Sequence, residues 1–229
     1  MSVEEKYSRL AYQFSEKSYV NVEEFMNHRL ELVLRWGYPL QPGDRLLELG
    51  CGDGYLGCLL ARRGLRYTGI DIAPGMIEAA RQRAQAQGVQ AKFLVMDMNH
   101  PRIDGEFEAI ISFSRTFFTY AHKPLELLRW IKAHTRKKVM VDWNHLCTLP
   151  LHKAVQLVRE AGFVRVGARP FLVPMKRRIP RVGQLLLYAL EVASPLGFFL
   201  TRKKFFVIIK GEVDPSQIAP TNGGAPAVE

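Results

Sequence analysis

The chain has 229 residues, of which 48% are hydrophobic, and its formal net charge is +10 at pH 7. This length allows one sizeable domain with additions, and the hydrophobic fraction is ordinary for a globular protein. The first ten residues contain early acidic side chains and no apolar core, so we expect no secretory signal. The three cysteines fit neither a disulfide framework nor a metal-ligand spacing, so we expect a reducing, cytoplasmic location and no metal site.

The positive charge is concentrated in the second half of the chain. Residues 122–210 carry 18 Lys and Arg against 4 Asp and Glu, whereas the rest of the chain is net negative. A basic half of this kind fits contact with nucleic acid, an anionic lipid surface or an acidic substrate, and it fits a solvated surface equally well.

Short apolar runs alternate with helical patterns through the chain. The expected strands are residues 45–50, 67–72, 91–98, 107–114, 138–144, 163–171 and 205–212. The expected helices are residues 55–64, 74–88, 123–135 and 151–162. This alternation predicts an α/β fold with a doubly wound, mostly parallel seven-stranded sheet. Ligands of such sheets bind at the carboxyl ends of the strands, near the switch in strand order.

The first expected strand runs into a glycine-rich loop, LLELGCGDGYLG, at residues 46–57. Glycines at Gly50, Gly52 and Gly54 let the backbone turn tightly and approach a ligand closely. The helix that follows offers unpaired N–H groups, which suit a phosphate or a carboxylate. With a fourth glycine at Gly57, a simple strand-to-helix turn is the weaker interpretation.

Acidic residues end the second and third expected strands. Asp71 stands about 20 residues beyond the loop, where a carboxylate accepts hydrogen bonds from ribose hydroxyls, and Ile72 can pack against adenine. Asp97 can accept a hydrogen bond from the exocyclic amine of adenine, and Met98 adds an apolar contact. These residues predict a nucleoside-binding site at the carboxyl end of the sheet.

Together these features resemble the class I S-adenosylmethionine-dependent methyltransferases, over roughly residues 43–144. The resemblance implies a Rossmann-like methyltransferase fold with S-adenosylmethionine as cofactor. It also implies that the glycine loop lies against the methionine part, that Asp71 holds the ribose, that Asp97 binds near adenine, and that Glu48 orients the loop. With Ser112 at the end of the fourth strand, the expected cofactor-binding residues are Glu48, Gly50, Gly52, Gly54, Asp71, Ile72, Asp97, Met98 and Ser112.

A dinucleotide-binding domain is the competing interpretation of the loop, because Gly52–Gly57 also fits the pattern G-x-G-x-x-G. About 45 residues precede the loop, whereas nicotinamide domains of this type usually open with it. Glu48 would also repel a pyrophosphate placed close to it. We therefore expect this match to be incidental, and an aminopropyl transferase on the same fold is a further alternative.

We expect methyl transfer to oxygen or carbon of a small, hydrophobic or lipid-linked acceptor. The fourth strand ends in Ser112-Phe113-Ser114-Arg115, which lacks the Asn/Asp-Pro-Pro-aromatic run common in enzymes that methylate base or amide nitrogens. A nucleic-acid partner is therefore not expected, although the basic half keeps RNA methylation as the second candidate. A non-catalytic cofactor-binding protein or a membrane-associated partner protein is the third.

Two residues near the end of the fifth strand are the candidate catalytic pair. His145 is a possible proton acceptor near neutral pH, and Asp142, three residues earlier, is the carboxylate expected to orient it. The alternative is a polar loop in which His145 bonds only to backbone. His122 and Tyr120 are weaker candidates.

Segments outside the expected methyltransferase domain, residues 43–213, have distinct compositions. Residues 1–42 are rich in aromatic side chains, and we expect them to form a helical lid over the cofactor. Residues 214–229 are rich in Pro, Gly and small side chains, so we expect a disordered tail. The candidate lid contacts are Tyr12, Phe14 and Tyr19.

An apolar insertion, residues 172–204, precedes the last strand and has basic clusters at both ends. Its apolar core, residues 182–200, approaches the length of a membrane span, but Pro195 and Gly197 interrupt it and Glu191 would be costly in lipid. We therefore expect no span. The insertion is either an apolar cap over the acceptor pocket or an interfacial element that rests on anionic lipid.

Overall fold

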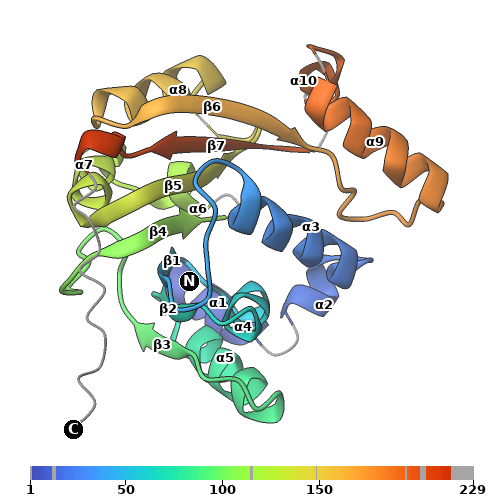
Figure 1. Cartoon of the computed structure of the whole chain (residues 1–229). Helices are drawn as coiled ribbons and strands as arrows, with labels where there is room; N and C mark the ends of the chain where they lie inside the picture. The colour runs from blue at the N-terminus through green and yellow to red at the C-terminus, as the bar shows by residue number, and fades with distance from the viewer. Residues whose placement is uncertain are drawn as a thin grey trace, which may run out of the picture.

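The computed structural model describes residues 2–11, 14–113, 116–147, 149–193, 195–201 and 205–217. A seven-stranded sheet with the order β3-β2-β1-β4-β5-β7-β6 runs through the molecule, and helices cover both of its faces (Figure 1). This arrangement confirms the predicted α/β fold. The strands are β1 (Arg45–Leu49), β2 (Arg66–Asp71), β3 (Lys92–Val95), β4 (Phe107–Ser112), β5 (Thr135–Trp143), β6 (Val164–Phe171) and β7 (Phe206–Glu212).

The described strands pair in parallel except where β7 takes part. The strand β1 pairs with β2 and β4, β2 with β3, and β4 with β5 in parallel, whereas β7 runs antiparallel to β5 and β6. The chain moves outward from β1 to β3 and then returns to β4 on the other side of β1. The carboxyl ends of β1 and β4 therefore form the switch point at which such sheets bind ligands.

The side chains of β1 divide the core into two layers. Leu46 packs in a buried cluster with residues of the helices on one face, while Leu47 and Leu49 pack with those on the other. This division follows from the alternation of side chains along a strand. The first face is covered by α3 (Val22–Arg35), α4 (Tyr55–Arg62) and α5 (Pro74–Ala86), and the second by α7 (Pro124–His134) and α8 (Leu151–Glu160).

Three short helices lie near the carboxyl ends of the central strands. They are α1 (Val3–Leu10), which packs against α5, and the five-residue helices α2 (Phe14–Ser18) and α6 (Thr116–Tyr120). The sequence did not indicate α2 and α6 separately, because five residues are too few to establish a helical period.

The insertion forms two helices, α9 (Arg181–Ala193) and α10 (Pro195–Thr201). Pro195 opens α10, and a proline at this position has no N–H with which to continue the hydrogen bonds of α9. The carboxylate of Glu191 is buried, and it accepts the N–H of Leu172 at 2.6 Å and lies 2.7 Å from His28 Nε2. Within the described part of the chain, no helix is long and apolar enough to cross a membrane.

Parts of several expected features lie outside the described residues. These parts are the lid residue Tyr12, the pair Ser114 and Arg115 after β4, the basic cluster 202–204, and residues 218–229 of the expected tail. The start of that tail forms a single turn, η1 (Pro215–Gln217). The division of the chain into lid, domain and tail stays a prediction.

Candidate functional site

A glycine-rich loop leaves the carboxyl end of β1 and enters α4. Gly50, Gly52 and Gly54 have φ values of 75°, 55° and 70°, in the left-handed region that residues with a Cβ rarely adopt. The N–H groups of Gly50 and Cys51 donate to the Ile70 carbonyl at 2.8 and 2.9 Å, which ties the loop to β2. A Cβ built on Gly52 meets no described atom within 4 Å, so open space for a ligand lies beside this residue.

Asp71 ends β2 beside this loop. Its Oδ2 accepts the N–H of Gly52 at 3.0 Å, and its Oδ1 accepts the N–H of Ala73 at 2.9 Å. Burial raises the pKa of the Asp71 carboxyl, and these hydrogen bonds oppose the rise. Because each carboxylate oxygen can accept a second hydrogen bond, Asp71 can hold the loop and still bind two hydroxyls of a ligand.

Glu48 is a buried carboxyl group in β1 that lines the same space. Its Oε2 accepts a hydrogen bond from the Tyr67 hydroxyl at 2.6 Å. Burial raises the pKa of Glu48 to about 7, although the Tyr67 hydroxyl and the charge of Arg29 act in the opposite direction. Glu48 therefore titrates near neutral pH, and a cation bound nearby would favour its ionised form.

A third group of residues follows β3. Asp97 Oδ1 accepts hydrogen bonds from the N–H and the side-chain amide of Asn99 at 2.9 and 3.0 Å, and His100 Nδ1 lies 3.2 Å from Oδ2. Burial would raise the pKa of Asp97, but these hydrogen bonds outweigh it and lower the pKa below its ordinary value. Met98 and Ile72 present apolar side chains to the pocket beside this carboxylate.

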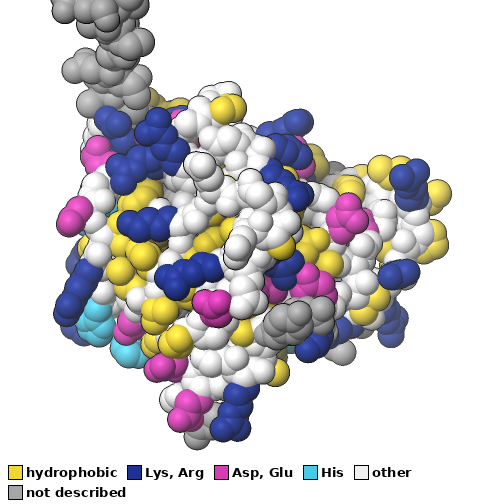
Figure 2. All heavy atoms as spheres, turned by 90° about the horizontal axis from the view of Figure 1, so that it is seen from below, with side chains coloured by type: hydrophobic (Ala, Val, Ile, Leu, Met, Phe, Trp, Pro, Cys, Tyr) yellow, Lys and Arg dark blue, Asp and Glu magenta, His cyan; other side chains and the backbone are white. Residues whose placement is uncertain are grey.

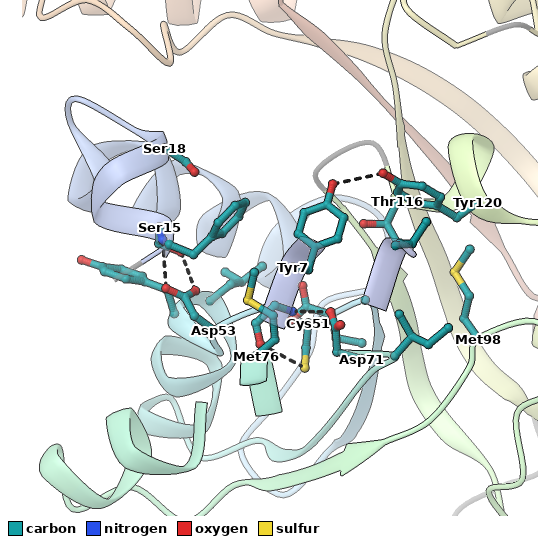
Figure 3. A pocket seen from close by; sticks show the side chains of 18 of the residues that line it. Tyr7, Ser15, Ser18, Cys51, Asp53, Asp71, Met76, Met98, Thr116 and Tyr120 are labelled. Carbon is teal, nitrogen blue, oxygen red and sulfur yellow. Dashed lines mark hydrogen bonds between the residues drawn. The ribbon is translucent and has the colours of Figure 1, made fainter. Parts of the chain in front are cut away.

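One pocket brings these groups together at the carboxyl ends of β1, β2 and β3 (Figure 3). Its volume of about 270 Å³ is just below the usual range for small-molecule sites, which begins at about 300 Å³. It lies at the switch in strand order between β1 and β4. Seven of the nine residues expected to bind a cofactor line it, namely Glu48, Gly50, Gly52, Asp71, Ile72, Asp97 and Met98.

The other two expected residues support the loop. A Cβ on Gly54 would come within 2.7 Å of an α5 side chain, so this glycine lets α4 and α5 pack closely. Ser112 is fully buried, and its hydroxyl donates to the Leu49 carbonyl at 2.8 Å. Gly57, the last glycine of the dinucleotide-like pattern, faces the Tyr67 ring, which lies 2.5 Å from a built Cβ. Packing therefore accounts for Gly57.

Helices from outside the glycine loop complete the pocket wall. Tyr7 of α1 and Tyr120 of α6 place their hydroxyl oxygens 3.1 Å apart (Figure 3). Ser15 of α2 donates through its N–H and its hydroxyl, at 2.9 and 2.6 Å, to the buried Asp53 carboxylate of the loop. Arg83 of α5 donates to the same carboxylate at 2.9 Å. The two bonds of Ser15 attach the N-terminal segment to the glycine loop, and the bond of Arg83 attaches α5 to it.

The expected lid residues Phe14 and Tyr19 line the pocket, whereas a covering motion of residues 1–42 stays a prediction. Sequence reasoning did not assign the contacts of Asp53 or the pocket position of Arg29. For Asp53 its place inside the glycine loop was a usable signal. Arg29 gave no such signal, because it reaches the pocket from a helix distant in sequence from the loop.

The candidate catalytic residues have separate surroundings. Asp142 is fully buried, and its Oδ2 accepts a hydrogen bond from the guanidinium of Arg29 at 3.4 Å. His145 is exposed and is not among the described residues that line the pocket, whereas His122 is among them. Asp142 lies within β5 and points into the buried interior, while His145 follows in the exposed turn. The role of His145 as a base stays a prediction.

Comparisons with known proteins find a methyltransferase domain model and several proteins named as methyltransferases. Residues 46–138 match the family model described as "Methyltransferase domain". Over 45 residues the chain is 51% identical to a malonyl-[acyl-carrier protein] O-methyltransferase of Serratia marcescens. This match covers 20% of this chain and 18% of that protein. Over 127 residues it is 32% identical to a 2-phytyl-1,4-naphtoquinone methyltransferase of Trichormus variabilis. This match covers 51% of this chain and 55% of that protein. The chain thus spans less than two thirds of either relative.

A solved structure extends the likeness over most of the chain. The crystal structure of magnesium protoporphyrin IX methyltransferase from Synechocystis PCC 6803 with bound S-adenosylmethionine has a TM-score of 0.61 and 18% sequence identity, over 93% of this chain and 92% of that one. At this identity the likeness concerns the fold. The matched family model contains the glycine loop, Asp71 and Asp97.

Proposed function

We propose that this chain, which belongs to the class I S-adenosylmethionine-dependent methyltransferases, transfers a methyl group from S-adenosylmethionine to a small molecule. The observation that carries the proposal is the position of the glycine loop, Asp71 and Asp97 around one pocket at the switch in strand order. The curated relatives named above, both methyltransferases, support it.

The residues of the pocket fit the groups of this cofactor. Asp71 has acceptor capacity for the two ribose hydroxyls, and Asp97 can accept from the adenine amine between the apolar side chains of Ile72 and Met98. The open space beside Gly52 suits the methionine part, and the ionised form of Glu48 favours a positively charged ligand.

The cofactor supplies a methyl group already activated by a sulfonium, so the protein's task is alignment and exclusion of water. Met26, Met175 and Phe206 come from three separate segments and line the same pocket. These apolar side chains exclude water and favour a hydrophobic acceptor, and the name of the naphtoquinone relative supports this choice. We propose oxygen or carbon as the acceptor atom. A lipid-linked acceptor, with peripheral contact to an anionic membrane, is part of the same proposal.

We propose that His122 is the proton acceptor, because it is the histidine among the described pocket residues. His122→Ala should lower the rate of methyl transfer by about 100-fold if the acceptor loses a proton to it. His145→Ala should leave the rate within about twofold, because His145 is not among the described residues that line the pocket. Initial rates measured with labelled cofactor separate the two. A large loss of rate in His145→Ala, with little change in His122→Ala, would instead support His145 as the base predicted from the sequence.

The proposed function is tested by incubating the purified chain with methyl-labelled S-adenosylmethionine and an extract of metabolites and lipids. We expect labelled product, detected by mass, with the wild type and with the control Asp104→Ala, whose side chain is exposed and is not among the described residues that line the pocket. Asp71→Ala should give much less product at a cofactor concentration near the wild-type dissociation constant. Absence of any labelled small molecule with the wild type, in an extract of the source cells, would count against the proposal.

A further inference from the structure

The helix α9 exposes its apolar face to solvent. Val182, Leu185, Leu186 and Val192 are 70%, 66%, 62% and 73% exposed. Their spacing places them along one side of the helix. A surface helix of a globular protein ordinarily turns such a stripe toward the core. In α9 this arrangement is reversed, because the apolar side of the helix faces solvent. The helix lies at the periphery of the molecule, beyond the ends of β6 and β7 (Figure 1).

The opposite side of α9 is polar and holds the helix in this orientation. Gln184 Nε2 and the Tyr188 hydroxyl donate to the two carboxylate oxygens of Glu24 in α3, at 2.5 and 3.0 Å. The buried Glu191 carboxylate lies 2.7 Å from His28 Nε2, and the His28 ring stacks on Tyr188 with centroids 4.3 Å apart. Rotating α9 to bury its apolar side would break these bonds and expose buried polar groups.

Basic side chains stand next to this apolar face. Lys176, Arg177, Arg178 and Arg181 are all exposed, immediately before α9 and at its first residue. The single acidic residue of the insertion is Glu191, which is buried among its partners. In the space-filling view, yellow hydrophobic and dark blue basic side chains lie together on the part that projects to the right, where Figure 1 places α9 (Figure 2).

We propose that the α9 face, defined as Val182, Leu185, Leu186 and Val192 with the four basic residues before and at the start of the helix, rests on an anionic membrane surface. The apolar residues would enter the boundary between headgroups and acyl chains, while the long basic side chains reach lipid phosphates. The charge pattern favours lipid as the occupant, because the insertion offers exposed positive charge and aliphatic surface while its single acidic residue, Glu191, is buried.

The segment before α9 connects this surface to the pocket wall. The membrane proposal therefore deepens the proposed function, on which this step rests. Met175, one residue before the basic cluster, lines the pocket, and its carbonyl accepts the N–H of Val20 at 2.8 Å. A hydrophobic acceptor dissolved in the membrane would therefore meet the protein at the segment that forms the pocket wall.

The proposal is tested by co-sedimentation of the full chain with vesicles, without cofactor. We expect the chain to bind vesicles of equal parts phosphatidylcholine and phosphatidylserine at low salt, and to bind pure phosphatidylcholine much more weakly. Leu185→Ser with Leu186→Ser should lower the partition coefficient by about tenfold or more. The control Leu146→Ser removes one similarly exposed leucine from the turn after β5 and should bind as the wild type does.

The charge contribution is tested separately. Changing Lys176, Arg177 and Arg178 to Gln should lower binding by about 100-fold, since each basic residue near an anionic surface contributes about a factor of five. Changing Arg62, Arg66 and Lys92 to Gln removes the same charge from exposed positions elsewhere and should have little effect.

Failure of the wild type to bind anionic vesicles at low salt would overturn the proposal, as would equal binding by the α9 variants and their controls. A dimer that the two leucine substitutions dissociate, seen by light scattering, would assign the face to a second copy instead. Because no methyl transfer is measured, these results do not depend on the proposed reaction, and loss of methyl transfer alone would leave the membrane proposal standing.

Discussion

Glu48 makes the stability of the fold depend on pH. Burial raises its pKa from 4.5 to about 7, so the folded chain keeps a proton between these pH values that the unfolded chain has lost. The stabilisation is fully present below the unfolded value and is lost as pH rises through the folded value. The shift corresponds to about 3 kcal/mol in the free energy of unfolding.

Glu48→Gln cannot ionise, and its carbonyl can still accept the Tyr67 hydroxyl. We therefore expect the wild type to lose up to about 3 kcal/mol relative to this variant between about pH 5 and about pH 8. Urea unfolding of both proteins at each pH measures the difference, and buried groups other than Glu48 contribute equally to both. A difference between the two proteins that stays constant with pH would show that Glu48 does not titrate in this range.

Single residues of the site differ in how far the sequence could predict them. Asp71 and Asp97 follow strands whose apolar pattern is plain, so their place at the sheet edge follows from parallel topology. The contact between Arg29 and Asp142 joins residues 113 positions apart and has no local signature. The sequence suggested a nearby histidine, His145, as the partner of Asp142, and this pairing stays a prediction; the contact with Arg29 depends on tertiary packing.

The glycine loop is the element that most constrains the pocket. Gly54→Ala introduces a Cβ at a φ of 70° and within 2.7 Å of an α5 side chain. Gly88→Ala is a matched control, because its φ is 62° but its built Cβ meets no described atom within 4 Å. We expect the control to cost about 1 kcal/mol in free energy of unfolding, and Gly54→Ala about 2 to 4 kcal/mol. Urea unfolding measures both, and equal costs would mean that the contact with α5 is unimportant.

Strands and long helices were predictable because their apolar periods are local. The antiparallel direction of β7 was not, since it depends on how the insertion returns the chain to the sheet. The orientation of α9 was not predictable either. Its apolar stripe is visible in the sequence, but its exposure depends on the partners of Glu24 and Glu191 in other elements.

At the scale of the whole molecule, the fold and the family could be predicted from the first half of the sheet. The matched family model covers residues 46–138, and the apolar pattern of the same stretch is the clearest in the chain. The acceptor side could not be predicted, because Met26, Met175 and Phe206 meet there from segments that only tertiary folding brings together. The net charge of +10 also did not show where charge gathers, and the structure places four exposed basic residues beside the apolar face of α9.

The central claim is that the pocket binds S-adenosylmethionine through Asp71, and titration calorimetry tests it most directly. Asp104→Ala should bind S-adenosylmethionine as tightly as the wild type does, and the same should hold for S-adenosylhomocysteine. Asp71→Ala should bind about 30-fold more weakly or worse, because hydrogen bonds to a charged group are lost, while circular dichroism verifies that it is folded. No heat of binding with the wild type, or unchanged affinity in a folded Asp71→Ala protein, would contradict the account.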